Sequence, residues 1–249
     1  MADFERPLMA HFQELRWRLS IVVIAIIIGA IIAAFFFEPL IKILEKPAAG
    51  YLSETGKPIF TDVTELVAIT VKIALMAGFI VAIPVLAFQI IMFVSPGLTK
   101  SERRYAVLMV PGALVCFAAG MTFAYFALLP PMLAFLLNFG SELAIPMIRI
   151  STYINLVLSL LFWMGLVFET PITMFILTKS RIVNRETFKK GRRFAVVIAF
   201  VLGALITPTF DPFNQTLVAL PFIILYEAGI WLSKLARHSE ETNLKKENE

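Results

Sequence analysis

Long uncharged runs alternate with short polar segments along the whole chain. A helix needs about 20 mostly apolar residues to cross about 30 Å of hydrocarbon. Six runs with at most one charged residue are candidates for such helices, and they cover residues 19–37, 73–94, 106–139, 154–178, 194–206 and 216–232. The third run is too long for one crossing, so we expect Pro130 and Pro131 to end that helix near Leu129. The pattern predicts an all-α polytopic membrane protein with six transmembrane helices, of which the fifth and sixth are short.

The composition agrees with this pattern. Apolar residues make up 59% of the 249 and charged residues only 16%, against roughly 25% charged residues in a soluble domain, and the mean hydropathy is +0.84. These values exclude a soluble globular enzyme. We expect one integral membrane domain over residues 1–249, with an amphipathic helix over 1–18, a six-helix bundle over 19–233 and a polar tail over 234–249.

The distribution of basic residues predicts the orientation, because Lys and Arg are retained on the cytoplasmic side of a membrane. The N-terminal segment, the second and fourth loops and the C-terminal tail together hold 17 of the 22 Lys and Arg residues. The first, third and fifth loops hold the other five. Both termini should therefore be cytoplasmic. The net charge of +4 and the isoelectric point near 9.2 follow from this topology and do not indicate nucleic-acid binding.

The connections between the runs have some expected structure of their own. Residues 39–44 alternate apolar and charged faces, as a short helix on the outer interface would. Asp62 and Glu65 have the spacing of a capping box that starts a helix over 62–94. We expect 132–139 to be another interfacial segment and the polar residues 237–249 to be disordered.

The residues needed for hydrolytic or redox catalysis are missing or lie outside the predicted helices. Both histidines, His11 and His238, are in the terminal segments. The single cysteine, Cys116, excludes an internal disulfide, and we expect it to be a small packing residue. A phosphate-loop-like stretch over 50–57 has the wrong glycine spacing, with Pro58 where Ser or Thr should follow. We therefore expect no enzyme activity, no catalytic residue, no metal site and no cofactor.

Two glutamates lie inside the predicted membrane helices. An acidic residue at the depth of Glu169 costs about 2.5 to 3.5 kcal/mol on insertion scales, so it needs a compensating interaction. One interpretation is a protonated carboxyl that is hydrogen-bonded to a neighbouring helix. The other is a polar contact for a substrate or partner helix, and the sequence does not decide between them. Glu227 lies near the cytoplasmic end of the sixth helix, two turns before Lys234, and we expect it to be a structural or interfacial residue.

Two further glutamates flank the predicted helices on the cytoplasmic side. The segment before the first run is amphipathic, with apolar residues every three or four positions at Phe4, Leu8, Phe12, Leu15 and Leu19. On this helix Glu14 and Arg18 share a flank, so spacing alone favours an i,i+4 ion pair worth a few tenths of a kcal/mol. Glu102 ends a second capping-box pattern that begins at Thr99 and would start the third helix.

Five motifs in the same order resemble those of the TatC family, the multispanning subunit of the twin-arginine protein translocase. They are His11-x-x-Glu14-Leu15-Arg16-x-Arg18-Leu19, Phe93 to Leu98 followed by Glu102-Arg103-Arg104, Phe123-x-Tyr125-Phe126, Phe168-Glu169-x-Pro171, and Thr207-Pro208 with Asp211 and Asn214-Gln215. The resemblance extends over nearly the whole chain. The last motif departs slightly, because many members have a shorter Thr-Pro-x-Asp.

The resemblance implies a receptor in the bacterial inner membrane for folded proteins whose signal peptides carry an Arg-Arg pair. It implies signal-peptide binding by Glu14 and Glu102, with Arg16 and Phe93 shaping the site, and a partner-helix contact at Glu169. Asp211 and Gln215 would belong to a structural or mechanistic loop. The implied partners are single-span TatA-type subunits, TatB where present, membrane lipids and other copies of the chain. The implied fold is a cupped six-helix bundle, and export would be driven by the proton-motive force.

Two other functions suit parts of the pattern. An ion-coupled secondary transporter also uses proline-interrupted helices and a buried acid. Such transporters usually have repeated halves and several convergent polar groups at the midplane, whereas only Glu169 lies deep in this chain and we find no internal repeat. The third possibility is a membrane scaffold without a ligand. A preference for Arg-Arg over Lys-Lys peptides would separate the receptor from both alternatives.

Overall fold

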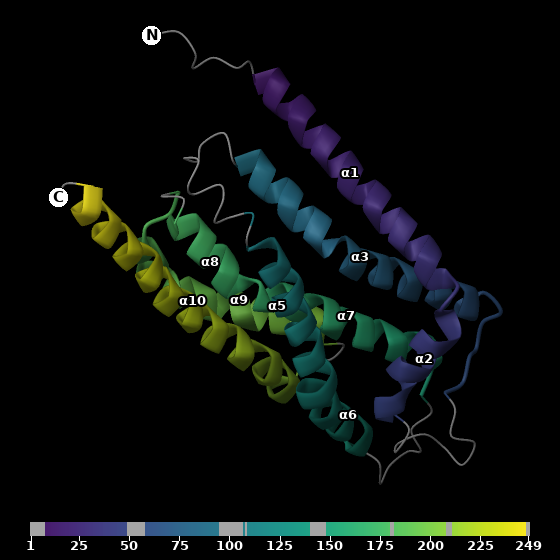
Figure 1. Ribbon diagram of the computed structural model, residues 1–249. Helices are drawn as coiled ribbons and strands as arrows, with labels where there is room; N and C mark the ends of the chain where they lie inside the picture. The colour runs from purple at the N-terminus through teal and green to yellow at the C-terminus, as the bar shows by residue number, and fades with distance from the viewer. Residues whose placement is uncertain are drawn as a thin grey trace. The chain divides into compact units, whose positions relative to one another are not determined.

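The computed structural model describes residues 8–48, 58–94, 107, 109–139, 148–179, 182–207 and 211–247. Within these ranges the chain is helical apart from short turns and loops and one isolated β-bridge. In chain order the helices are α1 (Leu8–Ala34), α2 (Phe37–Glu45), the 3₁₀ turn η1 (Lys46–Ala48), α3 (Glu65–Val94), α5 (Val110–Phe123), the π-helical turn η3 (Ala124–Leu128), α6 (Leu129–Asn138), α7 (Ile150–Phe168), α8 (Thr170–Lys179), α9 (Arg185–Ile206) and α10 (Pro212–Glu247) (Figure 1).

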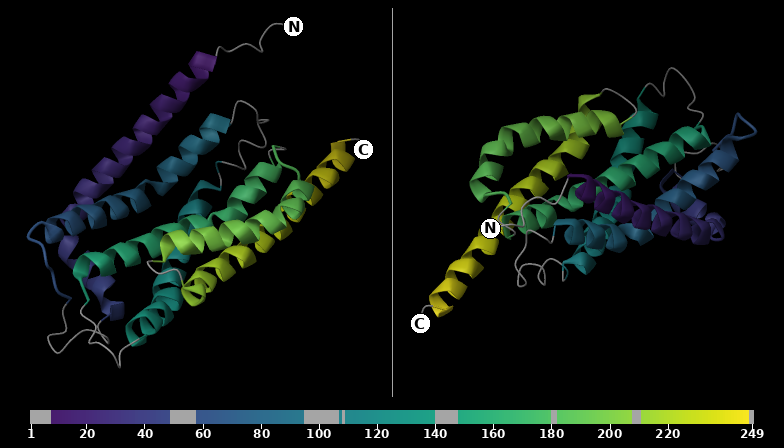
Figure 2. Two further views of the ribbon diagram at one scale, coloured as in Figure 1. Left: turned by 180° about the vertical axis from the view of Figure 1, so that it is seen from behind. Right: turned by 90° about the horizontal axis from the view of Figure 1, so that it is seen from above.

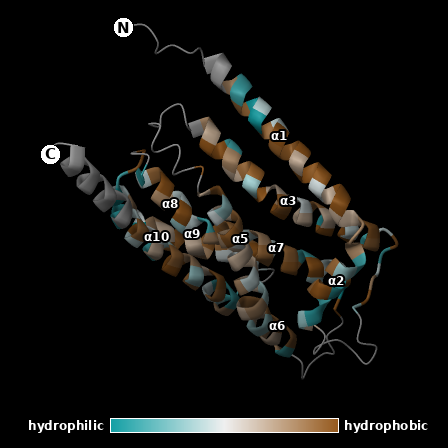
Figure 3. Ribbon diagram, viewed as in Figure 1, coloured by the Kyte–Doolittle hydropathy of each residue, from teal (hydrophilic) through white to brown (hydrophobic). Residues whose placement is uncertain are grey.

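The all-α prediction is confirmed, and the described residues of the predicted membrane runs are helical apart from turns at 35–36, 109, 139 and 169. Five described helical stretches are long and apolar enough to cross a membrane. The fifth predicted helix, α9, is outside this set because its first turns are polar and its uncharged part is only the 13-residue run 194–206. Figure 3 shows the same pattern in colour, with polar residues near the start of α1 and apolar residues along its remainder.

Pro130 and Pro131 predicted that the third membrane helix ends near Leu129, and this prediction was wrong. The helical path continues from α5 through η3 into α6, where Met132 and Leu133 are buried, and the interfacial position expected for 132–139 stays a prediction. Pro130 and Pro131 occupy the first turn of α6, where a residue without an N–H loses no intrahelical hydrogen bond. The π-helical turn before them absorbs the local change in winding.

The shorter segments match the predictions in part. The expected interfacial helix over 39–44 lies within α2, and the helix expected from Asp62 begins three residues later, at Glu65. The expectation of disorder from residue 237 was wrong, because α10 continues without a break to Glu247. Polar composition without an apolar stripe does not prevent a helix from extending beyond the membrane when its first turns are fixed by packing.

The chain forms two compact units, Met1–Pro39 with Thr70–Leu114, and Leu40–Ile69 with Val115–Glu249. In the first unit α1 and α3 cross at two glycines. A Cβ atom added to Gly29 would lie 2.9 Å from the Cα of Gly78, and one added to Gly78 would lie 2.5 Å from the backbone nitrogen of Ala30. Small residues at such a crossing let two backbones approach closely.

The second unit is built around α7, whose buried face includes Ile154, Val157 and Leu160. The α5 helix crosses it where the Phe117 ring lies against Gly165, at a place where any side chain would overlap the ring. The α10 helix packs along α8 and α9, and Figure 2 shows α9 beside α10 in both views. Ala195, Ala199 and Gly203 are buried on α9 one turn apart. The prediction of a single membrane domain with polar ends stays a prediction.

Candidate functional site

Glu14 lies in the polar first turns of α1 and binds Arg18. The Nε and Nη2 atoms of Arg18 donate to the Oε1 atom of Glu14 at 3.1 and 2.6 Å, which confirms the predicted i,i+4 pair. The Nη1 atom of Arg18 donates to the Oε1 atom of Gln89 on α3 at 3.2 Å. The Glu14 side chain keeps 31% of its surface exposed and that of Arg18 keeps 18%. The carboxylate is therefore held in place beside α3 and remains open to solvent.

Gln89 was missed by the sequence reasoning, and its only signal was a polar side chain within the uncharged run 73–94. Phe93 lies one turn further along α3 and is half-buried. Arg16 is exposed on α1, away from the Glu14 pair. Glu102 and the capping box predicted from Thr99 lie outside the described residues, so the joint role of Glu14 and Glu102 stays a prediction.

Glu169 lies at the junction of α7 and α8. It is the C-cap of α7, its N–H bonds the carbonyl of Leu166 at 3.1 Å, and Pro171 follows in the first turn of α8. The Oε1 atom of Glu169 is buried and has no hydrogen-bond partner. The backbone of Phe117 on the neighbouring helix α5 is a hydrogen-bond partner of the Glu169 carboxyl group, so the structural role and the partner role both stay predictions. A buried acceptor without a donor is costly.

The surroundings of Glu169 are fixed by close packing between α5 and α7. A Cβ atom on Gly120 would lie 2.5 Å from the carbonyl oxygen of Met164 and 2.9 Å from the Cβ of Phe168. The rings of Phe123 and Phe168 are 5.5 Å apart. These contacts hold the end of α7, and with it the backbone of Glu169, against α5.

Glu227 forms an ion pair with a residue of another helix. Arg192 of α9 approaches it through two parallel contacts, Nε to Oε1 at 2.7 Å and Nη2 to Oε2 at 2.8 Å. Lys234, seven residues further along the same helix, does not make this pair. The bidentate Arg192 pair therefore joins α9 to α10.

Asp211 caps the start of α10. Its Oδ1 atom accepts a hydrogen bond from the backbone N–H of Asn214 at 2.7 Å, and its Oδ2 atom accepts one from the Asn214 side chain at 3.0 Å. Asn214 is fully buried. The backbone of Gln215 lies against Gly203 of α9, where a Cβ atom would come within 2.9 Å of the Gln215 carbonyl oxygen. The described residues of the motif Thr207-Pro208 to Asn214-Gln215 thus fix the start of α10 against α9.

The tyrosine of the Phe123-x-Tyr125-Phe126 motif has a structural contact. Tyr125 lies in the π-helical turn η3, and its hydroxyl donates to the carbonyl of Ile43 at 2.5 Å. Tyr153 of α7 donates in the same way to the carbonyl of Leu44 at 2.6 Å. The final carbonyls of α2 are therefore bound by hydroxyls from two other elements, a connection that the sequence did not reveal.

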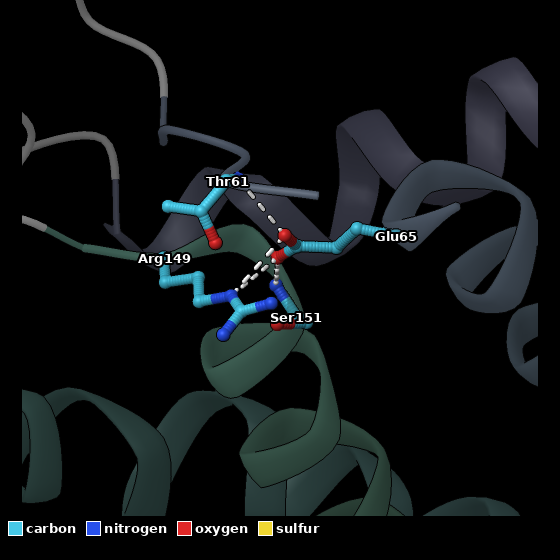
Figure 4. Close-up of polar contacts among 4 residues, drawn as sticks. All are labelled: Thr61, Glu65, Arg149 and Ser151. Carbon is cyan, nitrogen blue, oxygen red and sulfur yellow. Dashed lines mark hydrogen bonds and ion pairs between the residues drawn. The ribbon is translucent and has the colours of Figure 1, made fainter. Parts of the chain in front are cut away.

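Glu65 is the centre of a cluster that the sequence reasoning described only in part. Its Oε2 atom accepts from the backbone N–H of Thr61 at 3.0 Å, so it caps the loop as a capping-box glutamate does, but at a residue other than Asp62. The carboxylate also accepts from Arg149 Nε at 3.1 Å and from the backbone N–H of Ser151 at 2.9 Å (Figure 4). The Glu65 side chain is only 2% exposed.

Comparison with known proteins places these features in one family. The model of the family described as Sec-independent protein translocase protein (TatC) matches residues 10–221. The chain belongs to the TatC family. A TatC protein of Carboxydothermus hydrogenoformans is 38% identical over 240 residues, which cover 96% of this chain and 98% of that protein. A TatC protein of Aquifex aeolicus is 40% identical over 237 residues, covering 94% and 98%.

A solved structure agrees with the TatC assignment. The crystal structure of a twin-arginine translocase receptor, TatC, superposes with a TM-score of 0.80 at 38% identity, covering 91% of this chain and 99% of that one. The chain is therefore a multi-pass membrane component of Sec-independent protein translocation. The alternative of an ion-coupled transporter is not favoured. Within the described residues, no group of three or more His, Cys, Asp or Glu side chains is placed to hold a metal ion.

Proposed function

We propose that this chain is the receptor that binds twin-arginine signal peptides at the cytoplasmic face of the bacterial inner membrane. The observation that carries the proposal is the Glu14 carboxylate, which is exposed by about a third and already accepts the guanidinium group of Arg18. A carboxylate that accepts one guanidinium has the chemistry to accept another. Glu102 supplies the second carboxylate, and Arg16 and Phe93 shape the site around the peptide.

Two carboxylates suit the ligand because a twin-arginine signal carries two guanidinium groups. Each planar guanidinium forms paired, charge-assisted hydrogen bonds with a carboxylate, and an ammonium group of Lys cannot reproduce that geometry. The site lies on the polar start of α1, next to apolar turns of the same helix. The basic start of a signal peptide would bind there while its apolar part enters the lipid.

The Arg18 pair offers a matched test of this role. Glu14→Ala removes both the ion pair and the carboxylate, whereas Arg18→Gln removes the ion pair and keeps the carboxylate. If Glu14 binds the peptide, Arg18→Gln should bind an Arg-Arg peptide at least as tightly as wild type, while Glu14→Ala binds roughly ten- to a hundred-fold more weakly. Equal weakening in both variants would show that Glu14 acts only through its pair with Arg18.

We also propose that Glu169 contacts the membrane helix of TatA-type subunits, and of TatB where it is present. Its support is the buried Oε1 atom without a donor at the junction of α7 and α8. A donor on a partner helix that reached this oxygen would satisfy it. A photocrosslinker at position 169 should capture a single-span subunit in vesicles. Capture of lipid alone, under conditions in which transport proceeds, would contradict the assignment.

The remaining parts of the proposal follow from the distribution of charge and from the family. Both termini are cytoplasmic, in line with the 17 basic residues assigned to that side. The receptor works in membrane lipid together with other copies of itself, without nucleic acid or cofactor, and the proton-motive force drives export of the folded cargo.

A further inference from the structure

The first turns of α9 contain five basic residues, and three of them are bound within the chain. The Nε atom of Arg185 donates to the carbonyl of Ile230 at 3.3 Å, and the Nζ atom of Lys189 donates to the Oε1 atom of Glu186 at 2.7 Å. Arg192 forms the bidentate ion pair that joins α9 to α10. These three side chains therefore have structural partners.

The other two basic residues, Lys190 and Arg193, are exposed, and neither forms an ion pair with a residue that the structure describes. They are three positions apart, so their side chains are neighbours on one face of the helix. The guanidinium carbon of Arg193 lies 5.0 Å from the centre of the Phe194 ring, beside an exposed apolar surface. Glu186 is the one acid in the sequence between positions 185 and 194, and its carboxylate is bonded to Lys189. Two positive charges are therefore available to a ligand from outside the chain.

An apolar stripe, called here the α9 stripe, continues directly from these two charges. It consists of four residues that are between 53% and 67% exposed, namely Phe194, Val197, Val201 and Leu205. At 3.6 residues per turn they share an arc of about 120° with the two basic residues, and the buried small residues of α9 lie on the opposite side. The stripe is about 17 Å long at 1.5 Å per residue, close to half of the roughly 30 Å hydrocarbon layer. It therefore has the length of the acyl chains of one leaflet.

We propose that Lys190 and Arg193 bind the phosphate of an anionic phospholipid whose acyl chain lies along the α9 stripe. The planar guanidinium of Arg193 suits two phosphate oxygens at once, and the ammonium of Lys190 adds a compact second charge. Basic residues next to a membrane surface attract anionic headgroups in this way. Neither residue belongs to the signal-peptide site or to the contact at Glu169, so the inference goes beyond the proposed function.

A phospholipid is favoured over other ligands because it uses both features of this surface. An acidic protein segment in water would neutralise the two charges and leave the α9 stripe uncovered. An apolar partner helix would cover the stripe and leave the charges without an anion. A free phosphate ion would likewise use the charges alone. An anionic phospholipid has its phosphate joined to its acyl chains, in the same order in which the basic residues and the stripe follow each other along α9.

The test identifies the lipid that lies next to α9. A photocrosslinker replaces Val197 in the full chain, which is placed in vesicles of phosphatidylcholine with phosphatidylglycerol as the minor component, and mass spectrometry identifies the crosslinked lipid. Each basic residue near a membrane surface raises the affinity for an anionic lipid roughly fivefold. We therefore expect phosphatidylglycerol to be enriched over its bulk fraction by up to roughly 25-fold. Lys190→Gln and Arg193→Gln should each lower this enrichment roughly fivefold, and the double variant should remove it.

Arg192→Gln is the matched control, because it removes one positive charge from the same part of α9 but on the side that faces Glu227. It should keep the wild-type enrichment. Glycerol phosphate, which has the anion without acyl chains, should not reduce the enrichment when added at the same concentration as the lipid. The substituted side chains at 190 and 193 are exposed, so the variants should stay folded. Enrichment that persists in the double variant, an equal loss in Arg192→Gln, competition by glycerol phosphate, or capture of protein in place of lipid would each overturn the inference.

Discussion

Replacing Gly78 by alanine should separate α1 from α3 and destabilise the unit that carries Glu14. The added Cβ would lie 2.5 Å from the nitrogen and 2.9 Å from the Cα of Ala30, and it would meet the carbonyl of Ile26 more closely still. These neighbours are backbone atoms of α1, so no side chain can rotate away to make room. Only a shift of one helix against the other relieves the overlap.

The expected loss of stability in Gly78→Ala is the difference between two opposed effects. Alanine in a helix is favoured over glycine by about 0.8 to 1.0 kcal/mol, whereas overpacking a tight contact costs about 1 to 3 kcal/mol. Because the overlap is with backbone atoms, which cannot move without shifting the whole helix, we expect a cost near the top of this range. The net loss of stability is then about 2 kcal/mol. For a chain of this size, this loss lowers the melting temperature by about 4 to 8 °C.

The assay is thermal unfolding in detergent, with Gly191→Ala as the control. A Cβ at Gly191 meets only the hydroxyl of Tyr226, at 2.8 Å, which is the far end of a side chain that can turn. That variant should unfold within about 1 kcal/mol of wild type, because at most one neutral hydrogen bond changes. A Gly78→Ala protein that melts at or above the wild-type temperature would refute the α1–α3 crossing.

Three further outcomes are expected. Glu169→Ala should keep the melting temperature near wild type while crosslinking to a single-span partner falls, since the buried Oε1 atom has no bond within the chain to lose; a sharp fall in melting temperature with partner contact intact would make the carboxyl structural. Asp211→Ala should destabilise the protein by about 0.5 to 2 kcal/mol in denaturation experiments, as loss of a helix cap does, and Asp211→Ser should recover part of this. Phe213→Cys in a Cys116→Ala background should react with an impermeant maleimide only from the outer side, because Phe213 is 48% exposed at the start of α10; labelling only from the cytoplasmic side would contradict the crossing of α9 and α10.

The helices could be predicted because each one leaves a local signal. A run of apolar residues long enough to span a bilayer has few alternatives to a helix, since its backbone groups must bond within the segment. The prediction for α6 was wrong, because Pro130 and Pro131 were expected to end the helix. A proline ends a helix only where its missing N–H would have donated an intrahelical hydrogen bond. Pro130 and Pro131 lie in the first turn of α6, directly after the π-helical turn, where no such bond is lost.

The partners of the polar residues were harder to predict, because they come from other helices. The Glu14 and Arg18 pair has a local spacing and was found, whereas the bond from Arg18 to Gln89 links residues 71 positions apart. The sequence showed only Lys234 two turns after Glu227, whereas the packing of α9 against α10 brings Arg192 to this carboxylate. Spacing along one helix fixes which residues share a face, and only packing fixes what that face meets.

The group formed by Thr61, Glu65, Arg149 and Ser151 illustrates the same limit. The capping-box pattern correctly identified Glu65 as a residue at the start of a helix. It contained no information about Arg149 and Ser151, which lie 84 and 86 positions further along the chain. The buried carboxylate, and with it the connection between α3 and α7, is visible only when both helix starts are placed together.

The most direct test of the receptor assignment is the affinity of an Arg-Arg signal peptide for wild type, Glu14→Ala, Glu102→Ala and the double variant in vesicles, with a Lys-Lys peptide as the control. Each charge-assisted contact is worth about 1.5 to 3 kcal/mol, so each single variant should bind roughly ten- to a hundred-fold more weakly. The double variant should lose less than the sum, because both carboxylates bind one ligand. Folded single variants that both bind the Arg-Arg peptide with wild-type affinity would contradict the account.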